Sequence, residues 1–262
     1  MSFRNFVARS LLLLAILDWG MPTVYAEALP SMGATFAKQP PRIDGVIGRE
    51  EWAGAVPVFF PQTGEAVRSP QPYPGEIRVA WTKEGLYLAF QGIERNPVWG
   101  RTSKGSPLYQ EDVFEFFLDP TGDHRQYVEV QLSPGGQAYF KNYVLTAPLR
   151  LTLEKRLTQE FVESELWRYE IPSPENFKTA SRLDRKTHLW TLEAFFPAAF
   201  VNRRQGGGAL TPGKMRVNFA RYDWDRALGD TARQPRYFYW SPVLQGCPHI
   251  SPTSMGYLIL KP

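Results

Sequence analysis

Short apolar runs with a period of two recur along this chain between clusters of turn residues. Side chains of a β-strand alternate between its two faces, so runs of this kind predict strands with one buried face. The pattern predicts an all-β fold, an antiparallel two-sheet β-sandwich of jelly-roll or immunoglobulin-like type with about eleven strands. The expected strands are Val56–Phe60, Ile77–Trp81, Leu86–Gln91, Val113–Leu118, Tyr127–Leu132, Ala138–Val144, Leu166–Ile171, Trp190–Phe196, Met215–Arg221, Tyr237–Trp240 and Met255–Leu260.

Turn residues separate these runs, as the 23 prolines and 21 glycines of the chain allow. Thr82-Lys83-Glu84-Gly85 predicts a hairpin turn, and Pro120–Asp123 and Ser133–Gly136 end the strands before them. The stretch from Glu94 to Leu108 is a longer connection. Long ordered loops over a sandwich often carry function, so this connection is expected near a site.

The N-terminus has the pattern of a secretory signal peptide. Two arginines precede the apolar run Leu11 to Leu17, and the small-residue site Val24-Tyr25-Ala26 follows it. Asp18 interrupts the apolar residues, so the run is too short to span a membrane. We expect a signal peptide at residues 1–26, a single domain at residues 27–262 and a secreted or periplasmic protein, with an uncleaved membrane anchor as the alternative.

Charge and cysteine content argue against several classes of function. The formal net charge is +4, and short basic clusters such as Arg203-Arg204 lack the interleaved aromatic residues of a nucleic-acid platform. Cys247 is the single cysteine, which excludes an internal disulfide and a cysteine-based metal site. His124, His188 and His249 are too far apart in sequence to form a helical metal-binding pair. No nucleic-acid partner is expected.

One expected strand, within Tyr109 to Pro120, carries acids on both of its faces. Glu115 lies between Val113 and Phe117 on one face, while Phe114 belongs to the other face. A carboxylate between apolar side chains is costly unless it meets a cation, a metal, water or a ligand rich in hydrogen-bond donors. What Glu115 faces therefore decides whether the chain is a binding module, an enzyme or a scaffold.

Further carboxylates crowd this strand and its neighbour. A glycoside hydrolase needs two carboxyls about 5 to 10 Å apart, and adjacent antiparallel strands can hold Glu115 and Glu129 in this way, with Glu193 as the other choice of partner. Calcium is the other use of such acids, because it binds hard oxygen ligands. The aspartates that offer such ligands are Asp44, Asp112, Asp119 and Asp123. Their spacing matches no regular calcium loop, so the metal stays open.

Aromatic side chains in loops predict a stacking site. Sugars present apolar C–H faces to flat side chains, and their hydroxyl groups bind carboxylates and amides. Four aromatic side chains lie in or beside loops: Trp99, Tyr109, Trp224 and His249. The tryptophans of the periodic segments are expected in the core instead: Trp52, Trp81, Trp190 and Trp240.

An ordered series of short motifs covers almost the whole chain after residue 26. The motifs are Ile43-Asp44-Gly45, Trp52, Val79-Ala80-Trp81, Leu86-Tyr87, Glu111 to Pro120, Tyr127-Val128-Glu129-Val130, Trp190-Thr191-Leu192-Glu193, Pro197, Pro212-Gly213, Arg216 to Arg221, Tyr239-Trp240-Ser241-Pro242 and Met255-Gly256-Tyr257-Leu258. In this order they resemble the landmarks of the family 9 carbohydrate-binding modules, a β-sandwich group related to the DOMON domains. The resemblance implies a sandwich fold and a sugar ligand.

The resemblance also implies where such a sugar binds. The well-understood members hold a terminal sugar between two tryptophans, and these positions fall on Tyr109 and near His249 in this chain. Glu115 is implied to hydrogen-bond to sugar hydroxyls, and Gln131 and Asn218 lie on strands that contribute polar groups. Calcium occurs among such modules, so the resemblance admits it without naming its ligands.

We therefore predict a secreted, non-catalytic carbohydrate-binding protein that recognises a poly- or oligosaccharide of plant type, or its ends, and supports carbohydrate catabolism. No catalytic residue is assigned, and a glycoside hydrolase is the expected partner protein. Two alternatives stay open. One is a glycoside hydrolase acting on O-glycosyl bonds, and the other is a haem-binding sandwich domain, for which His249 with Met255 or Met215 is the available pair of ligands.

Overall fold

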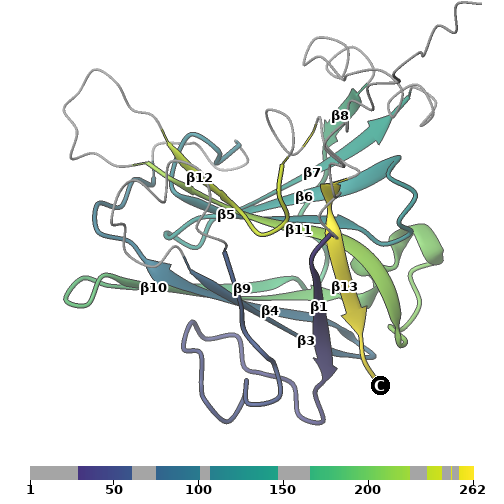
Figure 1. The fold of residues 1–262 in the computed structure, drawn as a ribbon, viewed down its shortest axis with the longest axis horizontal. Helices are drawn as coiled ribbons and strands as arrows, with labels where there is room; N and C mark the ends of the chain where they lie inside the picture. The colour runs from purple at the N-terminus through teal and green to yellow at the C-terminus, as the bar shows by residue number, and fades with distance from the viewer. Residues whose placement is uncertain are drawn as a thin grey trace, which may run out of the picture.

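The computed structural model describes residues 29–60, 75–100, 107–146, 166–224, 235–243, 249 and 254–262. The predicted signal peptide at residues 1–26 and Cys247 lie outside these ranges. Within them, the chain forms thirteen strands and two short helical turns (Figure 1), so the predicted all-β class is confirmed. None of the described helices has the length and apolar character that a membrane span requires.

Every run that the sequence predicts as a strand coincides with one. These strands are β2 Val58–Phe59, β3 Glu76–Thr82, β4 Gly85–Ile93, β5 Val113–Asp119, β6 Gln126–Leu132, β7 Ala138–Leu145, β8 Leu166–Glu170, β10 Leu189–Pro197, β11 Gly213–Asp223, β12 Arg236–Tyr239 and β13 Gly256–Leu260. The sequence missed β1 Ser31–Phe36, which is built largely of small residues, and β9 Lys178–Asp184, which is polar and, among the described strands, pairs with β10 alone. The helical turns are α3 Ala198–Val201 and η2 Arg203–Gln205.

One hydrogen-bonded path links the described strands in the order β8-β7-β6-β5-β11-β13-β1-β3-β4-β10-β9, with β12 beside β11 and β2 beside β3. β1 joins the two halves of this path. Its residues Ser31 to Ala34 pair in parallel with β13, and Thr35 and Phe36 pair in parallel with β3. The strands therefore form a curled mixed sheet, and the parallel pairs of β1 depart from the wholly antiparallel pairing expected from the sequence.

The two halves of the curled sheet enclose the main core (Figure 1). Phe90 on β4 stacks on Phe114 of β5 with ring centroids 4.7 Å apart, and Phe116 of β5 lies 5.3 Å from Phe196 of β10. Burying each such side chain contributes roughly 1.5–3 kcal/mol, so these contacts between opposite halves stabilise the curl. The tryptophans predicted in the core are all buried, with exposed fractions of 1%, 2%, 0% and 6% for Trp52, Trp81, Trp190 and Trp240.

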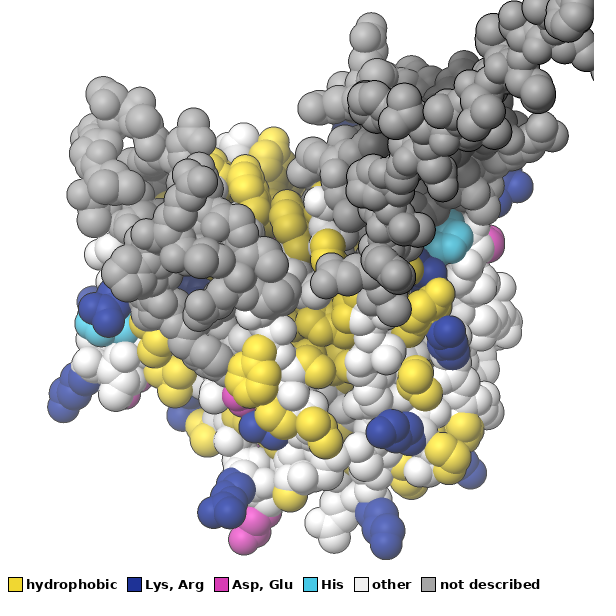
Figure 2. Space-filling view, in the orientation of Figure 1, with side chains coloured by type: hydrophobic (Ala, Val, Ile, Leu, Met, Phe, Trp, Pro, Cys, Tyr) yellow, Lys and Arg dark blue, Asp and Glu magenta, His cyan; other side chains and the backbone are white. Residues whose placement is uncertain are grey.

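Hairpin turns connect the strands as the sequence predicts. Thr82 pairs with Gly85 across a two-residue turn between β3 and β4. After β5, the Asp119 carboxylate accepts hydrogen bonds from the backbone nitrogens of Gly122 at 2.9 Å and His124 at 2.8 Å. On the face drawn in Figure 2, Lys and Arg side chains are scattered and do not gather in one patch.

Candidate functional site

A cavity of about 580 Å³ lies against the face of β5, β6 and β7 that points away from the main core. This volume is within the range of roughly 300–1,000 Å³ that small-molecule sites occupy. Four of the five predicted site residues line it: Tyr109, Glu115, Gln131 and His249. Its walls are rich in tyrosines: Tyr109, Tyr139, Tyr143, Tyr222, Tyr237 and Tyr239.

The strand register builds the floor of this cavity. Glu115 on β5 is paired with Gln131 on β6, and Gln131 is paired with Tyr139 on β7. Side chains at paired positions of adjacent strands point to the same face of a sheet. Glu115 shares a strand face with Val113 and Phe117 because side chains alternate with a period of two. On this face its carboxyl group points toward the cavity.

Glu115 is fully buried, and the protein satisfies only part of its carboxyl group. Its Oε1 accepts a hydrogen bond from Gln131 Nε2 at 3.1 Å, whereas no described residue donates a hydrogen bond to its Oε2. Burial, and then the charge of Glu129, raise the pKa of Glu115 well above its ordinary range, while Tyr222 and Gln131 oppose this rise. A raised pKa favours the protonated carboxyl, which can donate a hydrogen bond as well as accept one.

Gln131 positions the two acids of the floor. Its Nε2 donates to Glu115 and also to Glu129 Oε1, the latter at 2.8 Å. Its Oε1 accepts a hydrogen bond from the backbone nitrogen of Leu108 at 2.6 Å, which ties the loop before β5 to the floor. The Tyr143 hydroxyl donates to Glu129 Oε2 at 2.6 Å. Both N–H groups of the Gln131 amide are thus used within the protein.

His249 stands inside an aromatic stack at the side of the cavity. Its ring lies 4.3 Å from the ring of Tyr143 at an interplanar angle of 23°. Its Nδ1 is 2.9 Å from the Tyr127 hydroxyl, and its Nε2 is 3.8 Å from Glu129 Oε1. Burial lowers the pKa of His249, against the charge of Glu129. The imidazole side chain is 22% exposed, so it offers a ligand only part of a stacking surface.

Tyr109 has the more open ring of the two predicted stacking residues. It lies in the turn before β5 and is 46% exposed. Trp224 Nε1 donates to the backbone oxygen of Tyr109 at 3.1 Å, which holds the turn in place. Trp99, another loop aromatic, lines a separate cavity together with Arg95 and His188. Of the four loop aromatics, Tyr109 and His249 are the two that line the cavity over β5, β6 and β7.

Asn218, the fifth predicted site residue, does not line this cavity. Its Nδ2 donates to the backbone oxygen of Ser241 at 3.1 Å, and its Oδ1 accepts from the backbone nitrogen of Ser241 at 2.9 Å. The side chain is 1% exposed. In this structure Asn218 therefore fastens the segment after β12 to β11.

The sequence analysis missed most of the cavity wall. Tyr139, Lys141 and Tyr143 follow one another with a period of two on β7, and all three line the cavity. Arg168 on β8 and Tyr222 on β11 line it as well. The alternation on β7 was a usable signal, because it places aromatic and cationic side chains on the face that Glu129 and Gln131 share.

Glu193, considered as a catalytic partner of Glu115, lies on β10 in the other half of the sheet. Its Oε1 accepts a hydrogen bond from Trp52 Nε1 at 2.8 Å, and its Oε2 accepts one from the backbone nitrogen of Gly45 at 2.8 Å. It does not line the cavity. Glu129 is therefore the acid that the structure brings to Glu115.

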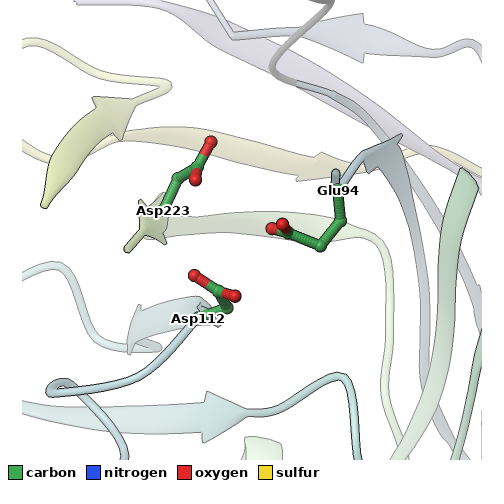
Figure 3. A group of neighbouring side chains, drawn as sticks. All are labelled: Glu94, Asp112 and Asp223. Atoms are coloured by element: carbon green, nitrogen blue, oxygen red, sulfur yellow. The ribbon is translucent and has the colours of Figure 1, made fainter. Parts of the chain in front are cut away.

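A second group of acids lies at the ends of β4 and β11 and before β5. Figure 3 shows the carboxylates of Glu94, Asp112 and Asp223 turned toward one another, and their ligand atoms lie within 4.8 Å of one another. Arg221 Nη2 lies 3.0 Å from Glu94 Oε2 and 3.5 Å from Asp223 Oδ2, while Arg236 Nη2 lies 2.9 Å from Asp223 Oδ2. Burial, and then the charge of Glu94, raise the pKa of Asp112 to about 8. Arginines and a proton therefore balance this cluster.

The aspartates considered as calcium ligands do not form one site. Asp112 belongs to the cluster just described, whereas Asp44 Oδ1 accepts from the backbone nitrogen of Val46 at 2.9 Å. Asp123 Oδ2 pairs with Arg204 Nη2 at 2.5 Å, and the same guanidinium lies 3.7 Å from Asp119 Oδ1. Each carboxylate is thus engaged with its own turn or arginine. In the described ranges these four residues do not fit a common calcium ion.

The side chains considered for haem are also separate. Met215 is buried in the main core, on the face of β11 opposite the cavity, and Met255 belongs to the apolar cluster beside the cavity. The two nitrogens of His249 face Tyr127 and Glu129. No arrangement within the described residues favours a haem site.

No protein-family model and no curated protein matches the chain. Three solved structures are similar to it. A candidate carbohydrate-binding protein from Bacteroides uniformis has a TM-score of 0.60 and 16% identity, over 89% of this chain and 100% of that one. Two further structures are family 9 carbohydrate-binding modules from Caldicellulosiruptor kristjanssonii. The complex with cellotriose has a TM-score of 0.57 and 13% identity, over 88% of this chain and 94% of that one. The complex with glucose has a TM-score of 0.53 and 14% identity, over 88% of this chain and 96% of that one. The chain therefore has the fold of a family 9 carbohydrate-binding module, as the order of its motifs predicts.

Proposed function

We propose that this chain is a secreted, non-catalytic carbohydrate-binding protein and that a poly- or oligosaccharide of plant type, or its end, binds in the cavity at Glu115. The observation that carries the proposal is the state of Glu115. It is a fully buried acid with one oxygen that no described residue satisfies, at the floor of a tyrosine-lined cavity. Such a group is costly in an apo protein unless water or a ligand reaches it.

The chemistry of the cavity suits a sugar. The exposed ring of Tyr109 can cover an apolar sugar face, as aromatic residues do in carbohydrate sites. A sugar hydroxyl both donates and accepts hydrogen bonds, so it matches the open oxygen of Glu115 in either protonation state. The fold of modules solved with cellotriose and glucose supports the same ligand class. A two-sheet sandwich architecture, a role in carbohydrate catabolism and a partner glycoside hydrolase belong to this proposal.

Calorimetric titration with cellotriose, xylotriose and glucose tests the proposal. Glu115→Ala removes the floor acid and is expected to weaken binding by tenfold or more, because hydrogen bonds to such groups are worth roughly 1.5–3 kcal/mol. Glu50→Ala removes an exposed acid elsewhere and is expected to leave affinity unchanged. Equal affinity of Glu115→Ala and the unmodified protein would rule this site out.

One observation favours a second candidate, a glycoside hydrolase. Glu115 and Glu129 both accept a hydrogen bond from Gln131 Nε2, at 3.1 and 2.8 Å, so two carboxyl groups lie side by side in the cavity. The raised pKa of Glu115 is the property of a general acid. Glu115→Gln keeps the shape of the side chain but cannot transfer a proton. Release of reducing sugar that this variant abolishes, with binding retained, would favour the enzyme over the binding module.

A further inference from the structure

Two cationic side chains share one wall of the cavity at Glu115. Lys141 on β7 and Arg168 on β8 both line it. Lys141 is paired across the strands with Glu129 on one side and Glu170 on the other, and Arg168 is paired with Tyr143. Because paired positions share a face, the register predicts ion pairs between Lys141 and these two acids.

The structure shows a different set of partners. Glu129 accepts hydrogen bonds from Gln131 at 2.8 Å and from Tyr143 at 2.6 Å. Glu170 Oε1 accepts one from the Tyr139 hydroxyl at 2.9 Å. Neutral donors thus occupy the acids that face Lys141. Among the described residues no carboxylate forms an ion pair with Lys141 or Arg168, and the Lys141 ammonium lies 5.8 Å from the centroid of the Tyr143 ring instead.

The remaining charges of the cavity do not balance these two cations. Glu129 is one acid of the lining, and the other, Glu115, has a pKa raised well above its ordinary range by burial and by Glu129. The positive charges of Lys141 and Arg168 also act at His249. Burial is the largest cause that lowers the pKa of His249, and each of these two cations lowers it further. With Glu115 protonated, the lining itself holds two cations and one acid, because Glu170, which faces Lys141, is exposed and lies outside the lining. An anionic group would balance the second cation.

We propose that the preferred ligand of this cavity is an acidic saccharide, whose carboxylate binds Lys141 and Arg168 while a hydroxyl of the same sugar binds Glu115. This inference rests on the proposed function and specifies its ligand class. A carboxylate accepts hydrogen bonds only, so it complements an ammonium and a guanidinium that donate only. Neutral sugars have no group that matches this wall equally well.

Calorimetric titration of the full chain with three probes tests the inference: tri-galacturonate, its methyl ester and cellotriose. The ester keeps the sugar rings and removes their charge. We expect tri-galacturonate to bind at least tenfold more tightly than its ester, and the double variant K141Q/R168Q to abolish this difference. K178Q, which removes an exposed lysine of β9 in the other half of the sheet, is the matched control and is expected to keep it.

The outcomes separate the two claims. Equal or tighter binding of the ester and of cellotriose would overturn the acidic ligand and leave the sugar-binding function standing. Lack of binding by all three probes would overturn both. If sodium acetate bound as tightly as tri-galacturonate, the claim that the ligand is a saccharide would also be overturned, because a carboxylate alone would then account for binding.

An NMR measurement on the unmodified protein tests the same contact without requiring that a variant folds. A carboxylate bound beside Lys141 and Arg168 cancels their effect on His249, so tri-galacturonate is expected to raise the pKa of His249 in an NMR titration, and its methyl ester is not. An unchanged His249 pKa with tri-galacturonate bound would overturn the proposed contact.

Discussion

Glu115 and Glu193 are both fully buried glutamates, one in each half of the curled sheet. Glu193 receives three donors: Trp52 Nε1 at 2.8 Å and the backbone nitrogens of Asp44 and Gly45 at 3.0 and 2.8 Å. Glu115 leaves Oε2 without a described donor. Burial raises the pKa of both groups, so the pKa does not separate them. The number of hydrogen-bond donors separates the two acids. A buried acid with all its acceptors satisfied stabilises the fold, whereas one with an unsatisfied oxygen beside a cavity is open to a ligand.

The largest expected effect comes from Glu193→Ala. The substitution leaves Trp52 Nε1 and two backbone nitrogens without their acceptor, and each unsatisfied buried donor costs about 1–3 kcal/mol. We expect the free energy of unfolding to fall by about 3–5 kcal/mol in denaturant titrations. Glu115→Gln, measured in parallel, should change it by less than about 1 kcal/mol. Similar losses in both variants would break the distinction between the two acids.

Asn218→Ala extends the comparison to a residue that the sequence assigned to the site. Asn218 holds both the backbone nitrogen and the backbone oxygen of Ser241, so it belongs with Glu193 among the satisfied groups. We expect a loss of about 2 kcal/mol in the free energy of unfolding, since both groups of Ser241 lose their partner. Sugar affinity, measured well below the unfolding temperature, should stay within about twofold. A selective loss of affinity with full stability would place Asn218 back in the site.

Asp112 is a third buried acid with a raised pKa, and it tests whether such a shift makes the stability of the protein depend on pH. Its pKa is about 8 in the folded protein, whereas an unfolded aspartate titrates near its ordinary value of about 3.9. The folded state therefore holds a proton that the unfolded state releases, so this stabilisation is present below about pH 4 and is lost as the pH rises toward 8. Unfolding titrations from pH 4 to 8 should show a slope that is shallower in Asp112→Asn by up to about 1.4 kcal/mol per pH unit. An identical slope in the variant would contradict the assignment.

The strands were predictable because they depend on local alternation. The runs around Phe114, Tyr127 and Trp190 each bury one or both faces, and the period of two records this directly. β1 was not predicted because its pairing is determined by the neighbouring strands. Its small residues from Ser31 to Phe36 pass from β13 to β3, and only the assembled sheet requires a strand there.

The site was predictable in part for the same reason. The position of Glu115 between two apolar neighbours already implied an unusual environment, and the family motif named Tyr109 and His249. The donors that satisfy an acid come from distant parts of the chain, as Gly45 does for Glu193 across 148 residues. One sequence does not reveal which acid receives them. The sequence therefore could not exclude Glu193 as the catalytic partner of Glu115 before the fold was known.

The smallest expected effect concerns Tyr109, the exposed partner of Glu115 in the cavity. Its ring is 46% exposed, so Tyr109→Ala should change the free energy of unfolding by less than about 0.5 kcal/mol. Stacking of one aromatic ring is worth about 1 kcal/mol, so sugar affinity should fall about fivefold. Tyr169→Ala, which removes a ring of 38% exposure that does not line the cavity, is the matched control and should leave affinity unchanged. Equal effects of the two substitutions would show that exposed tyrosines contribute nonspecifically, and the comparison would then rest on Glu115 alone.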